Sequence, residues 1–177
     1  MRKSQAAGAR QTTATLTRTL RRRYSTRNNH GFPRYIGAEQ VPLYCPESGK
    51  MRYADYLAVD SQTEEILQAG GTYKRMSAPV HGFEIKATRS DWLTEHRTGG
   101  AKSLTWRERC HYWWLVAPTV DVIRPEEVPP GWGLMVGTTR LRAVVKPERV
   151  EPTQPIDAPL MLTIARYAAR TPTHAHV

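Results

Sequence analysis

The sequence has only two cysteines, no long apolar run and, in its first 34 residues, no acidic side chain. Cys45 and Cys110 lie far apart and form no CxxC motif, which argues against a disulfide framework and against a zinc ribbon. The mean hydropathy of −0.57 leaves no room for a membrane span. We therefore expect a protein of the reducing cytoplasm that has no membrane as a partner.

The missing acids at the N-terminus make the charge of the chain uneven. The formal net charge is +10, but nine of the 26 basic residues lie within residues 1–34, where there is no Asp or Glu. The remaining residues carry 17 basic and 16 acidic side chains, so they are nearly neutral. A basic arm attracts phosphates regardless of sequence, because each neutralised phosphate releases counterions. This distribution indicates a nucleic acid as the partner.

Other interpretations of the basic arm stay open. An Arg-rich, acid-free segment is also typical of an organellar transit peptide, and residues 1–14 lack apolar periodicity, as a solvated disordered tail does. Residues 15–24 predict a short helix that opens the folded domain, with an apolar stripe of Leu16, Leu20 and Tyr24. The arginines on its other side are candidate contacts to nucleic acid: Arg21, Arg22 and Arg23.

The pattern of the remaining chain predicts one α/β domain with a sheet of mixed direction. Its 177 residues and 40% hydrophobic content suit one domain with its own core. We expect a disordered basic arm over 1–14, the domain over 15–150, and a linker with a packed helix over 151–177. The segment 61–80 is expected to be a connection with at most one strand. Strands are predicted over 51–60, 81–88, 111–118 and within 132–145, and helices over 89–97, 104–110, 124–127 and 158–169.

An acid and a lysine share one face of the predicted strand "HGFEIKAT". Alternation places Glu84 and Lys86 side by side, about 7 Å apart at the usual strand rise. A carboxylate next to an ammonium suits a metal-dependent attack on a phosphodiester. The same pair also suits a solvated ion pair on a strand, and a triplet of this kind is expected by chance about once in every two chains of this composition.

A magnesium ion needs more than one acidic ligand, so the triplet requires an upstream partner. Asp55 is the first candidate because it lies within the predicted strand "RYADYLAV", and Asp60 at the end of that strand is the alternative. Glu39 is a candidate third acid, and the backbone carbonyl of Ile85 would face a cation held between Asp55 and Glu84. The candidate cofactor is therefore Mg²⁺ or Mn²⁺.

The flanking sequences are more specific than the triplet. In order along the chain they are "RYADYLAV", "HGFEIKATRSDWL", Lys102, "YWWLVAP", "IRPEEVPPGWGLM" and "RLRAVVKP". Together they resemble small phage and bacterial proteins of the PD-(D/E)XK nuclease superfamily, of the MmcB-like DNA repair type. The resemblance covers about residues 35–147 and is strongest over 81–93 and 112–135.

This resemblance implies a restriction-endonuclease-like mixed sheet flanked by helices, and an endonuclease or nickase that acts on DNA in a bacterial or phage-infected cell. Asp55, Glu84 and Lys86 would be the catalytic residues, and the two acids would bind the metal. Glu39 would match a glutamate on the first helix. Lys102 would match a basic residue on the helix after the core strand, where it contacts phosphate. This chain departs from the pattern of the superfamily in that alanine, and not proline, precedes Asp55.

Several alternatives remain at this point. The chain could be a non-catalytic nucleic-acid-binding protein with the same fold and arm, or an enzyme that processes RNA. The substrate could be single-stranded, duplex or branched, and the oligomeric state is open, a dimer included. Arg89, at the start of a predicted helix, could reach a phosphate or be solvated. Of Trp113 and Trp114, which alternate on one strand, one is expected in the core and the other is a candidate platform for stacking bases.

Overall fold

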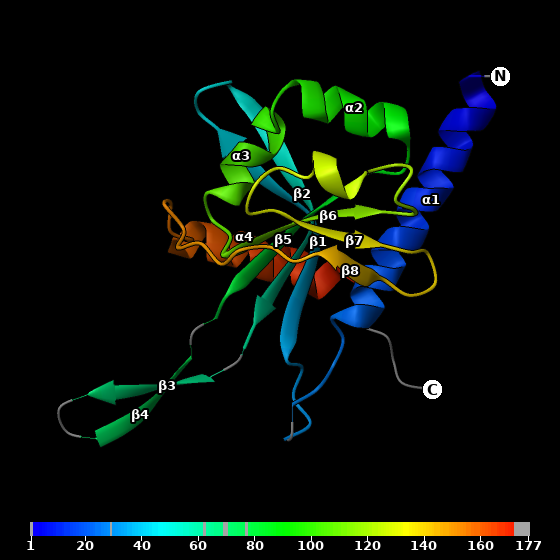
Figure 1. The fold of residues 1–177 in the computed structure, drawn as a ribbon. Helices are drawn as coiled ribbons and strands as arrows, with labels where there is room; N and C mark the ends of the chain where they lie inside the picture. The colour runs from blue at the N-terminus through cyan, green and yellow to red at the C-terminus, as the bar shows by residue number, and fades with distance from the viewer. Residues whose placement is uncertain (1, 29, 62, 69–70, 77, 172–177) are drawn as a thin grey trace.

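The six-stranded mixed sheet is the centre of the structure, a computed structural model that describes residues 2–28, 30–61, 63–68, 71–76 and 78–171 (Figure 1). Helices cover both faces of this sheet, which confirms the predicted α/β class. The elements in chain order are α1 (Arg2–Arg23), β1 (Tyr35–Cys45), β2 (Lys50–Asp60), β3 (Thr63–Gln68), β4 (Gly71–Met76), β5 (Val80–Ile85), α2 (Arg89–Arg97), α3 (Ala101–Arg107), β6 (Tyr112–Ala117), the 3-10 helix η1 (Pro125–Glu127), β7 (Gly133–Val136), β8 (Arg142–Val145) and α4 (Ala158–Arg170).

The sheet has the strand order β1-β2-β5-β6-β7-β8. β2 is antiparallel to both of its neighbours, β1 and β5. The strands β5, β6 and β7 run parallel to one another, and β8 forms the far edge antiparallel to β7. A parallel pair needs a crossover between its strands. Helices α2 and α3 form that crossover between β5 and β6, and Glu95 of α2 reaches Lys86, the residue that follows β5.

Two apolar clusters lie on the two faces of the sheet. One face packs against α2, α3 and α4 through Trp92, Trp106 and Leu160. The other face packs against the C-terminal half of α1, which contributes Leu16, Leu20 and Tyr24, the three residues of the predicted apolar stripe. Burial of these residues on one helical stripe is what attaches α1 to the sheet.

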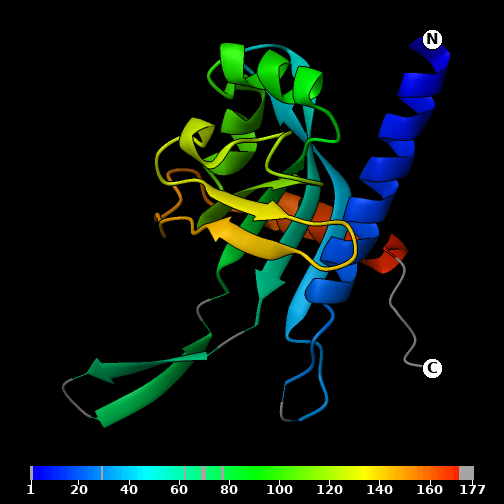
Figure 2. The ribbon, with the colours of Figure 1, turned by 45° about the vertical axis from the view of Figure 1, so that its right-hand side comes forward.

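Helix α1 starts earlier than the sequence indicated. It runs continuously from Arg2 to Arg23, so the expectation of a disordered arm over residues 1–14 is wrong in this structure. Apolar periodicity marks the part of a helix that packs, whereas the first half of α1 contains good helix formers such as Ala, Arg and Gln and no proline. Figure 2 shows this half extending beyond the sheet.

The segment 61–80 contains two strands, where at most one was expected. β3 and β4 form a separate antiparallel pair, which shares no ladder with the six-stranded sheet in the part of the chain that the structure describes. Figures 1 and 2 show this hairpin projecting from the body. The mostly polar sequence of the segment lacks the apolar alternation that indicates a strand against a core, so the pattern predicted a connection.

Two local features complete the fold, and one local prediction is wrong. β1 continues through Pro42, which is tolerated because β1 is an edge strand. The N-cap of α2 is Thr88, whose side chain accepts a hydrogen bond from the backbone N–H of Asp91, and Ser90 lies inside the helix. Trp113 and Trp114 are both buried, one in each cluster, so neither is a platform for bases.

Candidate active site

Asp55 and Glu84 meet where strands β2 and β5 stop pairing. The last paired residues are Tyr56 and Phe83, and the same register continued by one residue would place Asp55 opposite Glu84. The backbone N–H of Ile85 donates instead to Oδ2 of Asp55, over 2.7 Å. Because the N–H and C=O of one strand residue point to the same side, the carbonyl of Ile85 also faces this gap between the strands.

A local irregularity of β1 and β2 accompanies this arrangement. Ala54 and Leu57 lie in the same core cluster although three positions separate them, which breaks the alternation of a regular strand. On β1, Gln40 has a φ of 50°, and its Nε2 donates to Oδ1 of Asp55 over 2.9 Å. Both carboxylate oxygens of Asp55 are thus held by hydrogen bonds, and the side chain is fixed before any ligand binds.

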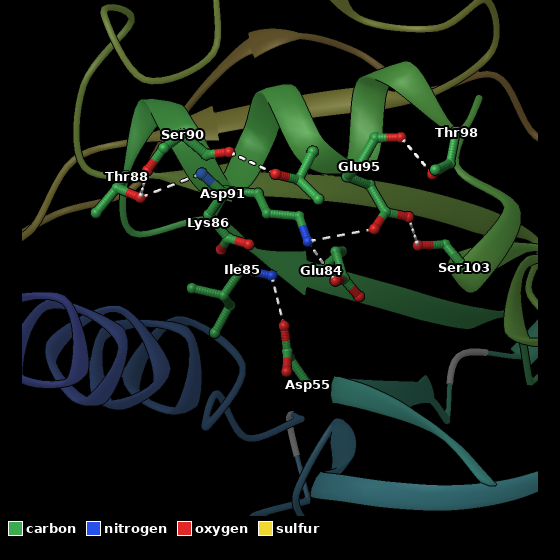
Figure 3. A network of polar contacts seen from close by, with 11 residues as sticks. Asp55, Glu84, Ile85, Lys86, Thr88, Ser90, Asp91, Glu95, Thr98 and Ser103 are labelled. Carbon is green, nitrogen blue, oxygen red and sulfur yellow. Dashed lines mark hydrogen bonds and ion pairs between the residues drawn. The ribbon is translucent and has the colours of Figure 1, made fainter. Parts of the chain in front are cut away.

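Lys86 lies between two acids on the face of the sheet that α2 and α3 cover (Figure 3). Its Nζ is 2.7 Å from Oε1 of Glu84 and 3.7 Å from Oε2 of Glu95. The predicted alternation of β5 is therefore confirmed: Glu84 and Lys86 share one face, and Phe83 and Ile85 are buried on the other. An ammonium that is held on two sides has its direction fixed.

Glu95 is the residue of this site that the sequence did not reveal. It lies on α2, is buried, and accepts a hydrogen bond from Oγ of Ser103 on α3 over 3.1 Å. The signal for it is its position three residues after the buried Trp92, which places both on the inward stripe of the helix. A glutamate on an inward stripe is rarely buried without a partner.

The environment raises the pKa of both strand carboxyl groups. Burial, with the nearby charge of Asp55, raises the pKa of Glu84 to about 7, although Lys86 opposes this. Burial also raises the pKa of Asp55, against the hydrogen bonds from Ile85 and Gln40. For Lys86, burial lowers the pKa, but the contact with Glu84 outweighs it and keeps the amine charged. A divalent cation would relieve the repulsion between the two acids.

Asp60 and Glu39 lie elsewhere in the structure. The carboxylate of Asp60 accepts two hydrogen bonds from the Arg34 guanidinium, at 3.2 and 3.0 Å. Asp60 lies near the start of β5, so Asp55 is the acid of β2 that lies beside Glu84. Glu39 lies on β1 and not on a helix, which corrects the expectation from the resemblance. It forms an ion pair with Arg21 at 2.5 Å, on the face of the sheet that α1 covers.

The basic residues predicted to contact nucleic acid fall into two groups. Arg21 and Arg89 are bound within the protein, to Glu39 and to Glu127 respectively. Lys102 is exposed on α3. Arg22 and Arg23 are exposed at the end of α1, where they donate to backbone carbonyls and line a cavity of about 170 Å³ together with Arg140.

A groove runs beside the site, between α1 and the start of α2. Its volume is about 690 Å³, and several of its lining residues directly follow Lys86 in the chain. Small side chains and hydroxyl groups form most of its wall, so extended chains can approach closely. The lining residues are Gly8, Ala9, Thr12, Ala87, Thr88, Arg89, Ser90 and Leu93.

Among the described residues, no group of three or more His, Cys, Asp and Glu side chains is arranged to hold a metal ion. The side chains that suit a hard cation are therefore the two carboxylates of Asp55 and Glu84, next to the carbonyl of Ile85. Mg²⁺ is commonly bound by one or two carboxylates while it keeps several waters, so this set fits such an ion. No helix of the described part has the length and apolar character required to cross a bilayer.

Comparison with known proteins adds evidence on the fold. No protein-family model matches the chain, and no curated protein matches it. A solved structure of a protein of unknown function from Silicibacter pomeroyi is similar, with a TM-score of 0.51 and 17% sequence identity, over 90% of this chain and 86% of that one. At this identity the similarity shows a shared fold and carries no function.

Proposed function

We propose that this protein is a metal-dependent deoxyribonuclease, an endonuclease or nickase of the PD-(D/E)XK kind. The observation that carries the proposal is the convergence of Asp55, Glu84 and Lys86 at the point where β2 and β5 separate. An acid from each of two strands, a backbone carbonyl and a fixed ammonium form one small group there. These are the donor types that phosphodiester hydrolysis with a divalent cation requires.

Asp55 and Glu84 would hold Mg²⁺ or Mn²⁺, with the carbonyl of Ile85 and water completing the ligand set. When bound, the cation would supply an activated water and stabilise charge on the phosphate. The hydrogen bonds from Gln40 and Ile85 orient the Asp55 carboxylate and leave lone pairs on both of its oxygens.

Lys86 would orient the reacting phosphate. Its ammonium has three donors, and the acids Glu84 and Glu95 fix the direction of the side chain, so a remaining N–H can point to an anionic oxygen. Because the site is largely buried, such a hydrogen bond is stronger than it would be in water. Ser103 acts through Glu95 and is a positioning residue.

The basic surface would hold the DNA backbone. Lys102, Arg22 and Arg23 are exposed and can bind phosphates, which fixes the strand without base readout. Arg21 and Arg89 would instead stabilise the fold through their acidic partners. The proposed setting is DNA processing or repair in the cytoplasm of a bacterial or phage-infected cell, where no membrane is involved.

The experiment that tests the proposal is a cleavage assay on plasmid and single-stranded DNA with Mg²⁺ or Mn²⁺. Glu84→Gln and Lys86→Ala are expected to abolish cleavage, and Glu126→Gln, an exposed acid on η1, is the matched control that keeps it. Cleavage that survives both substitutions would refute the mechanism. DNA binding without cleavage of any DNA or RNA substrate would instead favour the non-catalytic nucleic-acid-binding protein.

A further inference from the structure

Three large side chains are exposed on the ribbon that β1 and β2 form beyond Asp55. Tyr44, Tyr53 and Met51 have exposed fractions of 57%, 52% and 46%. In the register of the two strands, Tyr44 lies opposite Met51, and Tyr53 lies opposite Pro42. Residues that face each other in a ladder share one side of the sheet, so these four residues form one surface, which we call the ribbon face.

The ribbon face begins close to Asp55 along both strands. Moving along the two strands, the hydrogen-bonded side chains of Gln40 and Asp55 come first, and the pair of Pro42 and Tyr53 follows two residues further on. Because Ala54 is buried in the cluster under α2 and α3, Tyr53 lies on the other side of β2, the side that α1 covers. A ligand on the ribbon face therefore lies two residues from Asp55 along β2, on the α1 side of the sheet.

The opposite side of the same ribbon packs against the core. The tyrosines and Met51 are therefore exposed on a ribbon that is itself folded. Val41 and Ala54 are fully buried there, and Cys45 is buried at its end. The indole of Trp106 on α3 donates to the carbonyl of Arg52 and ties the ribbon to the domain. The ribbon face is thus a rigid surface that presents aromatic rings to solvent, and exposed patches of this kind indicate a binding site.

We propose that the ribbon face stacks unpaired bases and that the substrate of the site is single-stranded DNA. This inference rests on the proposed nuclease function. Tyr44 and Tyr53 are diagonal neighbours, whose side chains are separated by about 7–8 Å in a regular ladder. That separation is about twice the 3.4 Å rise of a nucleic acid strand, so one base fits between the two rings.

The charge of the neighbouring helix supports a nucleic acid as the occupant. α1 carries seven Arg and Lys residues and no acid, and three of the seven lie in its N-terminal half: Arg2, Lys3 and Arg10. Figures 1 and 2 show this half, α2 and the tip of the β1–β2 ribbon at the same end of the molecule. Cations and exposed aromatic rings at one end of a protein are the combination that binds single strands, because bases stack on the rings while phosphates contact the cations. The bases of a duplex are stacked on each other, and their faces are closed to such rings.

The test is fluorescence anisotropy with labelled oligothymidine and with a blunt duplex, in EDTA so that no cleavage occurs. The variants are Tyr44→Ala/Tyr53→Ala, Tyr44→Phe/Tyr53→Phe, and Ile36→Ala as a matched control, because Ile36 is also exposed on β1, with an exposed fraction of 50%. We expect the single strand to bind more tightly than the duplex. The alanine pair should weaken single-strand binding by about tenfold per ring lost, while the phenylalanine pair and the control stay near wild type.

Two results would overturn the proposal. One is unchanged single-strand affinity of the alanine pair, and the other is tighter binding of the duplex than of the single strand by the wild type. If light scattering shows a wild-type dimer that the alanine pair dissociates while DNA affinity stays constant, the face binds a second copy. Because binding is measured without metal, these results are separate from the failure of Glu84→Gln to stop cleavage, which would refute the nuclease function alone.

Discussion

The carboxylate of Asp55 accepts the backbone N–H of Ile85, so a side chain of β2 takes the place that a backbone carbonyl would have in the ladder. The hydrogen bond fixes the distance between the strand that carries Asp55 and the strand that carries Glu84 and Lys86. It also keeps the two strands apart at that point, which leaves the carbonyl of Ile85 and both acids facing one gap. The geometry of the candidate site therefore depends on a carboxylate whose role is partly structural.

Asp55→Asn is expected to separate these two roles. The amide oxygen can still accept from Ile85, and the Gln40 amide can turn its oxygen toward the new NH2 group, so the melting temperature should change little. Cleavage should fall by about 100-fold or more because the charged ligand is lost. Asp60→Asn should behave in the opposite way, losing about 2 kcal/mol of stability through its contact with Arg34 and keeping cleavage. Thermal melts measure the stability of both variants, and initial rates measure their cleavage of DNA. An active Asp55→Asn enzyme would contradict the assignment of Asp55 as a metal ligand.

Glu95→Gln tests whether Glu95 positions Lys86. The amide oxygen can still accept from Ser103, so the fold should stay intact, but the charge that holds the ammonium is removed. We expect kcat to fall about tenfold with KM for DNA unchanged, as for other positioning groups near a metal site. Ser103→Ala leaves the charge of Glu95 in place and should have a smaller effect. A kcat of Glu95→Gln equal to that of the wild type would mean that Glu95 does not position Lys86.

His81 predicts how stability depends on pH. Its ring accepts from the indole of Trp114 and stacks on Tyr112, and burial lowers its pKa from 6.5 to about 4. The unfolded chain therefore binds a proton at a higher pH than the folded one, so this contribution is complete above pH 6.5 and is lost as the pH falls toward 4.

The loss that His81 contributes between pH 8 and pH 5 is on the order of 2 kcal/mol. The raised pKa of Glu84 changes stability in the opposite direction over the same range, so the His81 contribution is measured as the difference between wild type and His81→Gln in urea denaturation at each pH. His81→Gln can still accept from Trp114 and should lack this contribution. His96→Gln, on the exposed side of α2, is the control. If His81→Gln keeps the wild-type slope, another group causes it.

Lys102 and Arg89 should differ in how their loss affects DNA binding. Lys102 is exposed, so Lys102→Ala should weaken binding and reduce the slope of log affinity against log salt by about one. Arg89 is paired with Glu127, which also accepts from the indole of Trp92. Arg89→Ala should therefore lower stability and leave the salt slope unchanged. A reduced slope for Arg89→Ala would show that Arg89 reaches a phosphate.

Much of the local structure could be predicted because it follows from neighbours in the chain. The alternation of Glu84 and Lys86 against Phe83 and Ile85 identified strand β5 and the shared face of the pair. The hairpin of β3 and β4 and the first half of α1 were not predicted, because their sequences lack the apolar periodicity of elements that pack against a core.

The sequence by itself determined the α/β class, the basic N-terminal segment, and the strand that carries Glu84 and Lys86, because periodicity and charge are properties of adjacent residues. Only the tertiary structure decided that Asp55 and not Asp60 lies beside Glu84, that Glu95 contacts Lys86, and that Tyr44 and Tyr53 are exposed while both tryptophans are buried. These facts depend on strand register and helix crossover, which bring together residues that are distant in the chain.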